Sequence, residues 1–210
     1  MIEKKRAVVV GSCSIKNYKK IKSFLKKDDF FIFCDGGLKH QKKLRVQPDL
    51  IVGDFDSHKK PKTKIETIVL PCEKDDTDTI FAVKEAIRRG FTDFLLVGVI
   101  GKRLDHSFGN LSILLKLDEL NFSGMIIDDF SQMCIASKNQ NVEISEEFKF
   151  FSVINLDNSA KSVTIKNAKY PLENKEIPCD YQYGISNEVL PGKTACVSLE
   201  NGRALVIKIW

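Results

Sequence analysis

Over the first 130 residues, short apolar runs alternate with stretches in which apolar residues recur at helical spacing. The helical spacing is clear at Ile80, Val83 and Ile87 and again at Phe108 and Leu111. The runs that we expect to be strands are residues 7–10, 30–34, 50–52, 67–70, 94–99 and 125–127. This alternation is typical of β-α units around a parallel sheet. The pattern therefore predicts a doubly wound, mostly parallel α/β domain over residues 1–137.

After about residue 140 the helical period disappears. The β-branched and aromatic runs at 148–156, 162–165, 194–199 and 204–209 predict strands. Asn201-Gly202 separates the last two runs and predicts a two-residue hairpin, because Asn-Gly tolerates the positive φ of a type I′ turn. We expect an antiparallel β-sandwich over residues 138–210, with the boundary set by the change of period alone.

Composition narrows the class of protein. The 210 residues are 43% hydrophobic and 29% charged, which excludes a disordered, collagen-like or coiled-coil chain. No apolar run is long enough for a signal peptide or a membrane span, so we expect no membrane partner. Six cysteines without a C-x-x-C pair suit a reducing compartment, and we expect a cytoplasmic protein. The net charge of +5 comes without a basic block, and nothing in the sequence recommends nucleic acid as a partner.

Polar clusters follow four of the predicted strands. In chain order they are Asp35-Gly36-Gly37, Gly53 to Ser57, Lys74 to Asp78, and Gly101 to His106. In an open parallel sheet, ligands bind beyond the carboxyl ends of the strands, where the loops and the helix N-termini meet. We therefore expect the four clusters to form one site at that edge.

Acidic residues dominate these clusters, and like charges placed close together repel unless a cation neutralises them. Mg²⁺ prefers oxygen ligands, usually one or two carboxylates together with water and phosphate oxygens. Asp54, Asp56 and Asp78 are the expected ligands. Zinc is not expected, because the histidines and cysteines lack the spacing of zinc ligands.

Each cluster also has an ordinary structural interpretation. Asp35-Gly36-Gly37 is either a turn or a place where the backbone approaches a nucleotide. Asp76 or Thr77 is a candidate helix N-cap, and Lys102 and Arg103 are either surface charges or phosphate ligands. The ordinary interpretation is favoured for any single cluster. All four at one edge favour a Mg-nucleotide site.

In this order and spacing, the clusters resemble the thiamine pyrophosphokinase family. Further matching stretches are residues 48–57, Asn110, 169–174 and 184–188. The resemblance implies an N-terminal domain that binds Mg-ATP, a C-terminal sandwich that binds thiamine, and a homodimer with active sites between subunits. It also implies transfer of the pyrophosphoryl group of ATP to the thiamine hydroxyl, giving thiamine diphosphate and AMP.

The resemblance also suggests residue roles. Asp54, Asp56, Asp78 and Arg103 match the catalytic positions, with Asp78 or Asp56 accepting the hydroxyl proton. The expected residues on the nucleotide side are Asp35, Gly36, Gly37, Ser57, Asp75, Thr77, Lys102, Arg103, Asp105 and His106. Those on the thiamine side are Tyr170, Ser186 and Asn187.

Some details depart from the family or stay open. Lys102 stands where a Gly usually precedes the Arg, and Ala168 stands where a Gly commonly precedes Lys-Tyr. Tyr170 has two interpretations, a ring stacked on thiamine or a strand aromatic in the core, and the core is favoured. Two other functions remain as alternatives. One is a nucleotide-sugar glycosyltransferase that holds its metal with a D-x-D motif, and the other is a non-catalytic ATP or thiamine sensor of the same fold.

Overall fold

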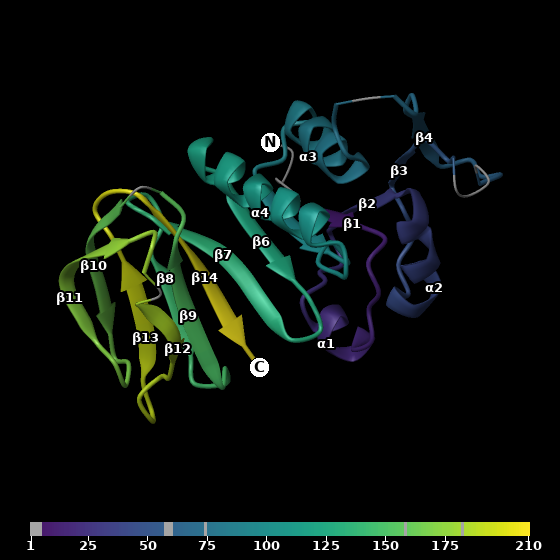
Figure 1. Ribbon diagram of the computed structural model, residues 1–210. Helices are drawn as coiled ribbons and strands as arrows, with labels where there is room; N and C mark the ends of the chain where they lie inside the picture. Colours follow the sequence, from purple (N-terminus) through teal and green to yellow (C-terminus); the bar gives the residue numbers. More distant parts are fainter. Residues whose placement is uncertain (1–5, 57–60, 74, 158, 182) are drawn as a thin grey trace. The chain divides into compact units, whose positions relative to one another are not determined.

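The computed structural model describes residues 6–56, 61–73, 75–157, 159–181 and 183–210. The chain separates into two compact units (Figure 1). The first comprises Met1–Leu117 with Phe122–Asp129, and the second comprises Asp118–Asn121 with Phe130–Trp210. The change of hydrophobic period near residues 137–141 coincides with the turn between two strands of the second unit.

The first unit is built on a parallel sheet. Its strands are β1 (Ala7–Val10), β2 (Phe30–Cys34), β3 (Leu50–Gly53), β4 (Glu66–Val69), β5 (Asp93–Val97) and β6 (Ser123–Ile127). They lie in the order β6-β5-β1-β2-β3-β4, and every neighbouring pair is parallel. The six predicted strands are confirmed, with ends that shift by one or two residues.

Helices cover both faces of this sheet (Figure 1). They are α1 (Tyr18–Ser23), the 3-10 helix η1 (Asp35–His40), α2 (Gln41–Leu44), α3 (Asp78–Arg88) and α4 (Leu104–Glu119). Ile21 and Leu44 share a core with Val8 and Val10 on one face, while α3 packs on β1, β2 and β3. The doubly wound arrangement is confirmed. Within the described ranges, no helix has the length and apolar character needed to cross a membrane.

The strand order reverses beside β1. The chain builds β1 to β4 in one direction and then returns, so that β5 pairs with the other side of β1. Such a reversal opens a crevice at the carboxyl ends of the two diverging strands, and ligands of doubly wound sheets bind there. The loops after β1 and β5 therefore lie at the expected binding edge.

The second unit is a sandwich of two antiparallel sheets. Its strands are β7 (Ser131–Ser137), β8 (Val142–Ser145), β9 (Phe150–Asn155), β10 (Ser159–Lys166), β11 (Leu172–Pro178), β12 (Gly184–Asn187), β13 (Thr194–Ser198) and β14 (Arg203–Ile209). In one layer the strands pair in the order β12-β9-β14-β7, and the other layer is a four-stranded sheet with the order β11-β10-β13-β8. Val153 and Val206 from the first meet Val163 and Val197 from the second in one buried core.

The hairpin predicted at Asn201-Gly202 is wrong. β13 pairs with β10 and β8, whereas β14 pairs with β7 and β9, so the turn carries the chain from one sheet to the other. Of the two turn residues Asn201 and Gly202, only Gly202 has a positive φ, which is 86°. A type I′ turn needs a positive φ at both central residues. The Asn201 backbone instead bridges to Lys161, which leads the chain across the sandwich.

An ionic network fixes α3 to the far edge of the sheet. Glu85 accepts from Arg88 Nε at 2.7 Å and from Arg89 Nε at 2.8 Å, and Arg89 also reaches Glu66 on β4. Glu85 is buried. The guanidinium of Arg88, with that of Arg89, lowers the pKa of Glu85 from 4.5 to about 2. The ionised carboxylate is thus preferred in the folded chain.

Removing this carboxylate tests its contribution to stability. A depressed pKa gives stability that is complete above pH 4.5 and is lost as the pH falls through about 2. We expect Glu85→Gln to lower the free energy of unfolding by about 1 kcal/mol at pH 7, because Arg88 is largely exposed and its attraction is screened by water. The loss should shrink towards pH 2 in urea titrations. Equal losses at pH 7 and pH 2 would contradict this origin, and Glu176→Gln, at an exposed position, is the control.

Candidate active site

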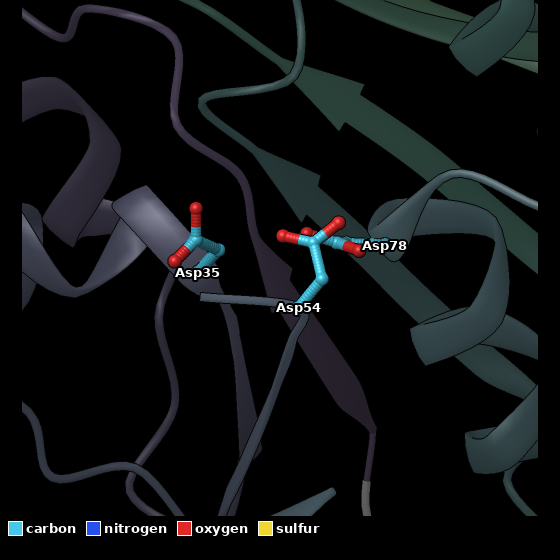
Figure 2. Close-up of side chains that lie close together, drawn as sticks. All are labelled: Asp35, Asp54 and Asp78. Atoms are coloured by element: carbon cyan, nitrogen blue, oxygen red, sulfur yellow. The ribbon is translucent and has the colours of Figure 1, made fainter. Parts of the chain in front are cut away.

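Three aspartates meet at the carboxyl edge of the parallel sheet. Asp35 begins η1 directly after β2, Asp54 follows β3, and Asp78 begins α3. One carboxylate oxygen from each lies within 4.8 Å of those of the other two. All three residues are half-buried, and Figure 2 shows their carboxyl groups close together at the ends of their segments. We call these residues the acidic group.

The backbone is shaped to bring Asp35 against β3. A Cβ at Gly53 would lie 2.9 Å from the Cβ of Asp35, so only glycine permits this approach. Asp35 has a φ of 30° and Phe55 a φ of 55°, a region that side chains with a Cβ rarely adopt. Strained backbone of this kind persists where the surrounding structure enforces it, and it is concentrated at functional sites.

Asp78 is held by its helix and by β2. The Thr77 side chain accepts from Ile80 N at 3.3 Å, so Thr77 is the N-cap of α3 and Asp78 is its first residue. The carboxylate thus lies at the positive end of the helix dipole. The thiol of buried Cys34 donates to the Asp78 carbonyl at 3.6 Å. Burial, with the nearby charge of Asp78, raises the pKa of Cys34 far above its usual range, which keeps this thiol neutral.

The acidic group fits a hard divalent cation. Its donors are all carboxylate oxygens from three separate segments, the ligand type that Mg²⁺ prefers. Three negative charges at this separation repel one another, and a cation between them would relieve the repulsion.

The composition of the acidic group differs from the predicted ligand set. Asp54 and Asp78 belong to it, and Asp35, predicted on the nucleotide side, is the third member. Asp56 is exposed, and its backbone N–H donates to Asp54 Oδ1 at 3.4 Å. The signal for Asp35 was its position directly after the strand next to β3. Ser57, also predicted here, lies outside the described residues.

Arg103 lies in the loop between β5 and α4. It is exposed, and its guanidinium pairs with Asp105 through Nε at 3.2 Å and Nη2 at 2.5 Å. The Arg103 guanidinium lowers the pKa of Asp105 to about 2. Two side chains of α4 bond to this loop: the Ser107 hydroxyl accepts from Gly101 N at 3.1 Å, and Asn110 Nδ2 donates to the Val99 carbonyl at 2.8 Å. These bonds tie the start of α4 to the end of β5.

The remaining predicted residues on the nucleotide side fall into two sets. Asp75, Lys102 and His106 are exposed near the same edge. Gly36 and Gly37 are buried. A Cβ at Gly37 would lie 2.3 Å from the Val10 carbonyl oxygen, so this glycine is required by the packing of η1 on β1. Gly37 thus has a packing role within a 3-10 helix, which differs from the turn that was one of its two interpretations.

In the second unit, Tyr170 and Asn187 line a hollow of about 420 Å³, together with Lys169, Tyr183 and Ile185. This volume suits a small organic molecule. Tyr170 is 61% exposed, so its assignment to the core is wrong; it lies in the bend between β10 and β11 and not in a strand. Ser186 is exposed with a φ of 59°.

Asn187 is buried, and its amide braces the bend that carries Tyr170. Its Oδ1 accepts from Tyr170 N at 3.0 Å and from Glu188 N at 2.9 Å, and its Nδ2 donates to the Tyr170 carbonyl at 2.7 Å. A buried amide with this many bonds to the backbone fixes the local conformation. The structure thus connects Asn187 to the hollow through the position of Tyr170.

Comparison with known proteins gives matches to both units. Residues 21–126 match the model of the thiamin pyrophosphokinase catalytic domain, and residues 139–203 match that of the thiamin pyrophosphokinase vitamin B1 binding domain. A thiamine pyrophosphokinase from Bacillus subtilis is 29% identical over 145 residues, 66% of this chain and 68% of the relative. A thiamin pyrophosphokinase from Caenorhabditis elegans is 24% identical over 172 residues, 77% of this chain and 70% of the relative.

Solved structures share the fold. The crystal structure of thiamine pyrophosphokinase from Bacillus subtilis superposes with a TM-score of 0.86 at 22% identity. The match covers 98% of this chain and 99% of the Bacillus subtilis chain. The yeast thiamin pyrophosphokinase structure has a TM-score of 0.74 at 13% identity, and the match covers 100% of this chain and 88% of the yeast chain.

Charge repulsion within the acidic group predicts a stability effect. With EDTA present, Asp54→Asn should raise the free energy of unfolding by about 1 kcal/mol, because it removes one of three neighbouring negative charges and keeps the shape. Urea denaturation at pH 7 measures the change. Asp28→Asn, at an exposed position beyond the opposite edge of the sheet, should have little effect. A loss of stability in Asp54→Asn would show that repulsion is not significant here.

Proposed function

Since the chain belongs to the thiamin pyrophosphokinase family, we propose that it transfers the pyrophosphoryl group of ATP to the hydroxyl of thiamine, giving thiamine diphosphate and AMP. The main support is the acidic group, which lies at the carboxyl edge of a doubly wound sheet inside the segment that matches the catalytic domain. The match of residues 139–203 to a vitamin B1 binding domain supports thiamine as the acceptor.

We propose that Asp35, Asp54 and Asp78 hold Mg²⁺. Their carboxylate oxygens are the kind of ligand that Mg²⁺ prefers. One oxygen from each residue lies within 4.8 Å of the other two, which places all three around one position. When bound, Mg²⁺ supplies positive charge that neutralises phosphate oxygens.

The chain's own residues would position the reactants and move one proton. Transfer of this kind depends mainly on in-line placement and on neutralising charge. Arg103 offers a planar fork of donors for phosphate oxygens and would exchange its pairing with Asp105 for them. Asp56 and Asp78 are the two candidates to accept the proton of the hydroxyl, which is a poor nucleophile while protonated.

The second unit would bind thiamine in the 420 Å³ hollow. The exposed ring of Tyr170 offers a flat surface for an aromatic ligand, and the hydrogen bonds of Asn187 hold the Tyr170 backbone in place.

We further propose a cytoplasmic homodimer with active sites between subunits. The six cysteines are unpaired, which suits a reducing compartment, and exposed aromatic residues such as Tyr181 and Tyr183 offer a surface for a second copy.

Release of AMP tests the activity. With ATP, Mg²⁺ and thiamine, AMP should form in step with thiamine diphosphate, as followed by a coupled assay and chromatography. Asp54→Asn should lower turnover by about a hundredfold, because a metal ligand loses its charge, while Asp28→Asn keeps it. No AMP from the wild type would exclude the activity and leave a sensor. AMP formation with full turnover in Asp54→Asn would exclude the metal assignment. The glycosyltransferase alternative does not account for the match at residues 139–203.

The division of labour between the two units predicts a split in Michaelis constants. Asn187→Ala should raise the KM for thiamine about tenfold or more and leave the KM for ATP within about twofold, because the brace on Tyr170 is lost and the first unit is untouched. Circular dichroism checks the fold. Asn139→Ala removes an exposed amide that bonds to Asn121 in the same unit and is the matched control. An effect on ATP alone would contradict the assignment.

A further inference from the structure

The loop after β1 and the loop after β5 are locked together beyond their strands. Gly11 N donates to the Val97 carbonyl and Cys13 N donates to the Gly98 carbonyl, both at 2.8 Å. A Cβ at Gly11 would lie 2.6 Å from the Gly98 carbonyl oxygen, and one at Gly101 would lie 2.7 Å from Cys13 Sγ. These contacts fix the loop that leads to Arg103 against the loop after β1, at the point where the strand order reverses.

His40, the last residue of η1, contacts the loop after β1 at Cys13. The imidazole is only 2% exposed. Its Nε2 lies 2.8 Å from the Cys13 carbonyl oxygen, and its Nδ1 lies 2.6 Å from the Tyr18 hydroxyl. A carbonyl can only accept, so Nε2 carries the hydrogen, and in the neutral ring Nδ1 accepts from Tyr18. Burial lowers the pKa of His40, which favours this neutral form. Both ring nitrogens are therefore committed.

The Cys13 peptide consequently joins two parts of the site. Its carbonyl accepts from His40, and its N–H donates to the Gly98 carbonyl. The six-residue segment η1 runs from Asp35, a member of the acidic group, to His40. The Lys39 ammonium, in the same segment, donates to the Ser12 carbonyl. A continuous set of hydrogen bonds thus runs from the segment of Asp35, through Cys13, to the loop of Arg103.

We propose that His40 is a positioning residue: by holding the Cys13 carbonyl, it fixes the segment that begins with Asp35 relative to the loop that carries Arg103. This inference rests on the proposed function, in which Asp35 holds the metal and Arg103 binds phosphate. Residues that hydrogen-bond to metal ligands typically change metal affinity by 10–100-fold when they are altered, and we expect the lower end of this range for a residue that holds the segment of a ligand. A displacement of about 1 Å in such a site can lower turnover by about a hundredfold.

Two substitutions of His40 each keep a different one of its two hydrogen bonds, to the Cys13 carbonyl and to the Tyr18 hydroxyl. His40→Gln places an amide nitrogen near the Nε2 position and keeps a donor for the Cys13 carbonyl. His40→Asn places its amide near the Nδ1 position, so it keeps a partner for Tyr18 and loses the bond to Cys13. Both variants remove the ring and leave one of its two hydrogen bonds, so a purely structural role predicts equal losses in both.

The experiment measures Mn²⁺ binding by electron paramagnetic resonance, without ATP or thiamine, next to the midpoint of thermal unfolding and the kcat for AMP release. We expect His40→Asn to weaken Mn²⁺ binding and lower kcat, each by about tenfold or more, and His40→Gln to stay within about threefold of wild type. Thermal midpoints should be similar in the two variants. Equal Mn²⁺ affinity in both variants, whether lowered or unchanged, would overturn the proposal.

A control isolates the effect of stability alone. Asp29 pairs with Arg6 at 2.8 Å where β1 and β2 begin, at the edge of the sheet opposite the acidic group. Asp29→Asn should lower the thermal midpoint and leave Mn²⁺ binding unchanged. Should His40→Asn fail to fold, His40→Phe serves instead, since it keeps an aromatic ring of similar size and loses the bond to the Cys13 carbonyl; unchanged Mn²⁺ binding there would overturn the proposal. Because Mn²⁺ binding needs no substrate, wild-type binding without AMP release would refute the proposed function and leave the role of His40 measurable.

Discussion

The mutual repulsion of three carboxylates is the constraint on which the first unit depends. Asp35, Asp54 and Asp78 come from three segments, and their oxygens lie within 4.8 Å of one another. Such crowding is unfavourable in the absence of a cation. The position of Asp78 at the positive end of the α3 dipole offsets part of that cost, and the bond from Cys34 to the Asp78 carbonyl helps to hold the residue in place.

The same edge of the sheet shows that close backbone approach, more than side-chain chemistry, sets the positions of the acids. Gly53 leaves room for Asp35, and Gly37 leaves room for the end of β1. The positive φ values of Asp35 and Phe55 show that this edge accepts conformational strain. Glycines at 37 and 53 are thus as necessary to the acidic group as the aspartates that form it.

The second unit is a β-sandwich that carries a hollow of a size suited to a small molecule. Its core is made of alternating inward residues of two antiparallel sheets, as in Phe150–Asn155. The hollow lies beside the bend that carries Tyr170, between β10 and β11. There the side-chain amide of Asn187 bonds to the backbone N–H and carbonyl of Tyr170, which belongs to no strand. A buried polar side chain here costs little because three hydrogen bonds to the backbone satisfy it.

Much of the first unit was predictable from the sequence. Strands buried on both faces read as continuous apolar runs, so local pattern sufficed for most of the sheet. Asp54 directly follows such a run, and Asp78 begins the amphipathic helix after the next strand, so two members of the acidic group could also be found from local pattern. The second unit was less predictable. β7 is buried along its whole length although its sequence mixes polar and apolar residues, and β11 is mostly polar, so neither carries the period of a strand.

What only the tertiary structure decided is which segments meet. The partner of Asp54 and Asp78 is Asp35 rather than Asp56, because adjacent parallel strands bring the ends of β2 and β3 together, whereas Asp56 lies beyond the positive-φ residue Phe55. The Asn201-Gly202 turn joins two sheets, because each flanking strand finds its partners far along the chain. The sequence by itself determined the elements of the first unit and the chemistry of their ends, since these depend on neighbouring residues. Contacts across the chain determined the site, because distances between segments depend on packing that no local pattern encodes.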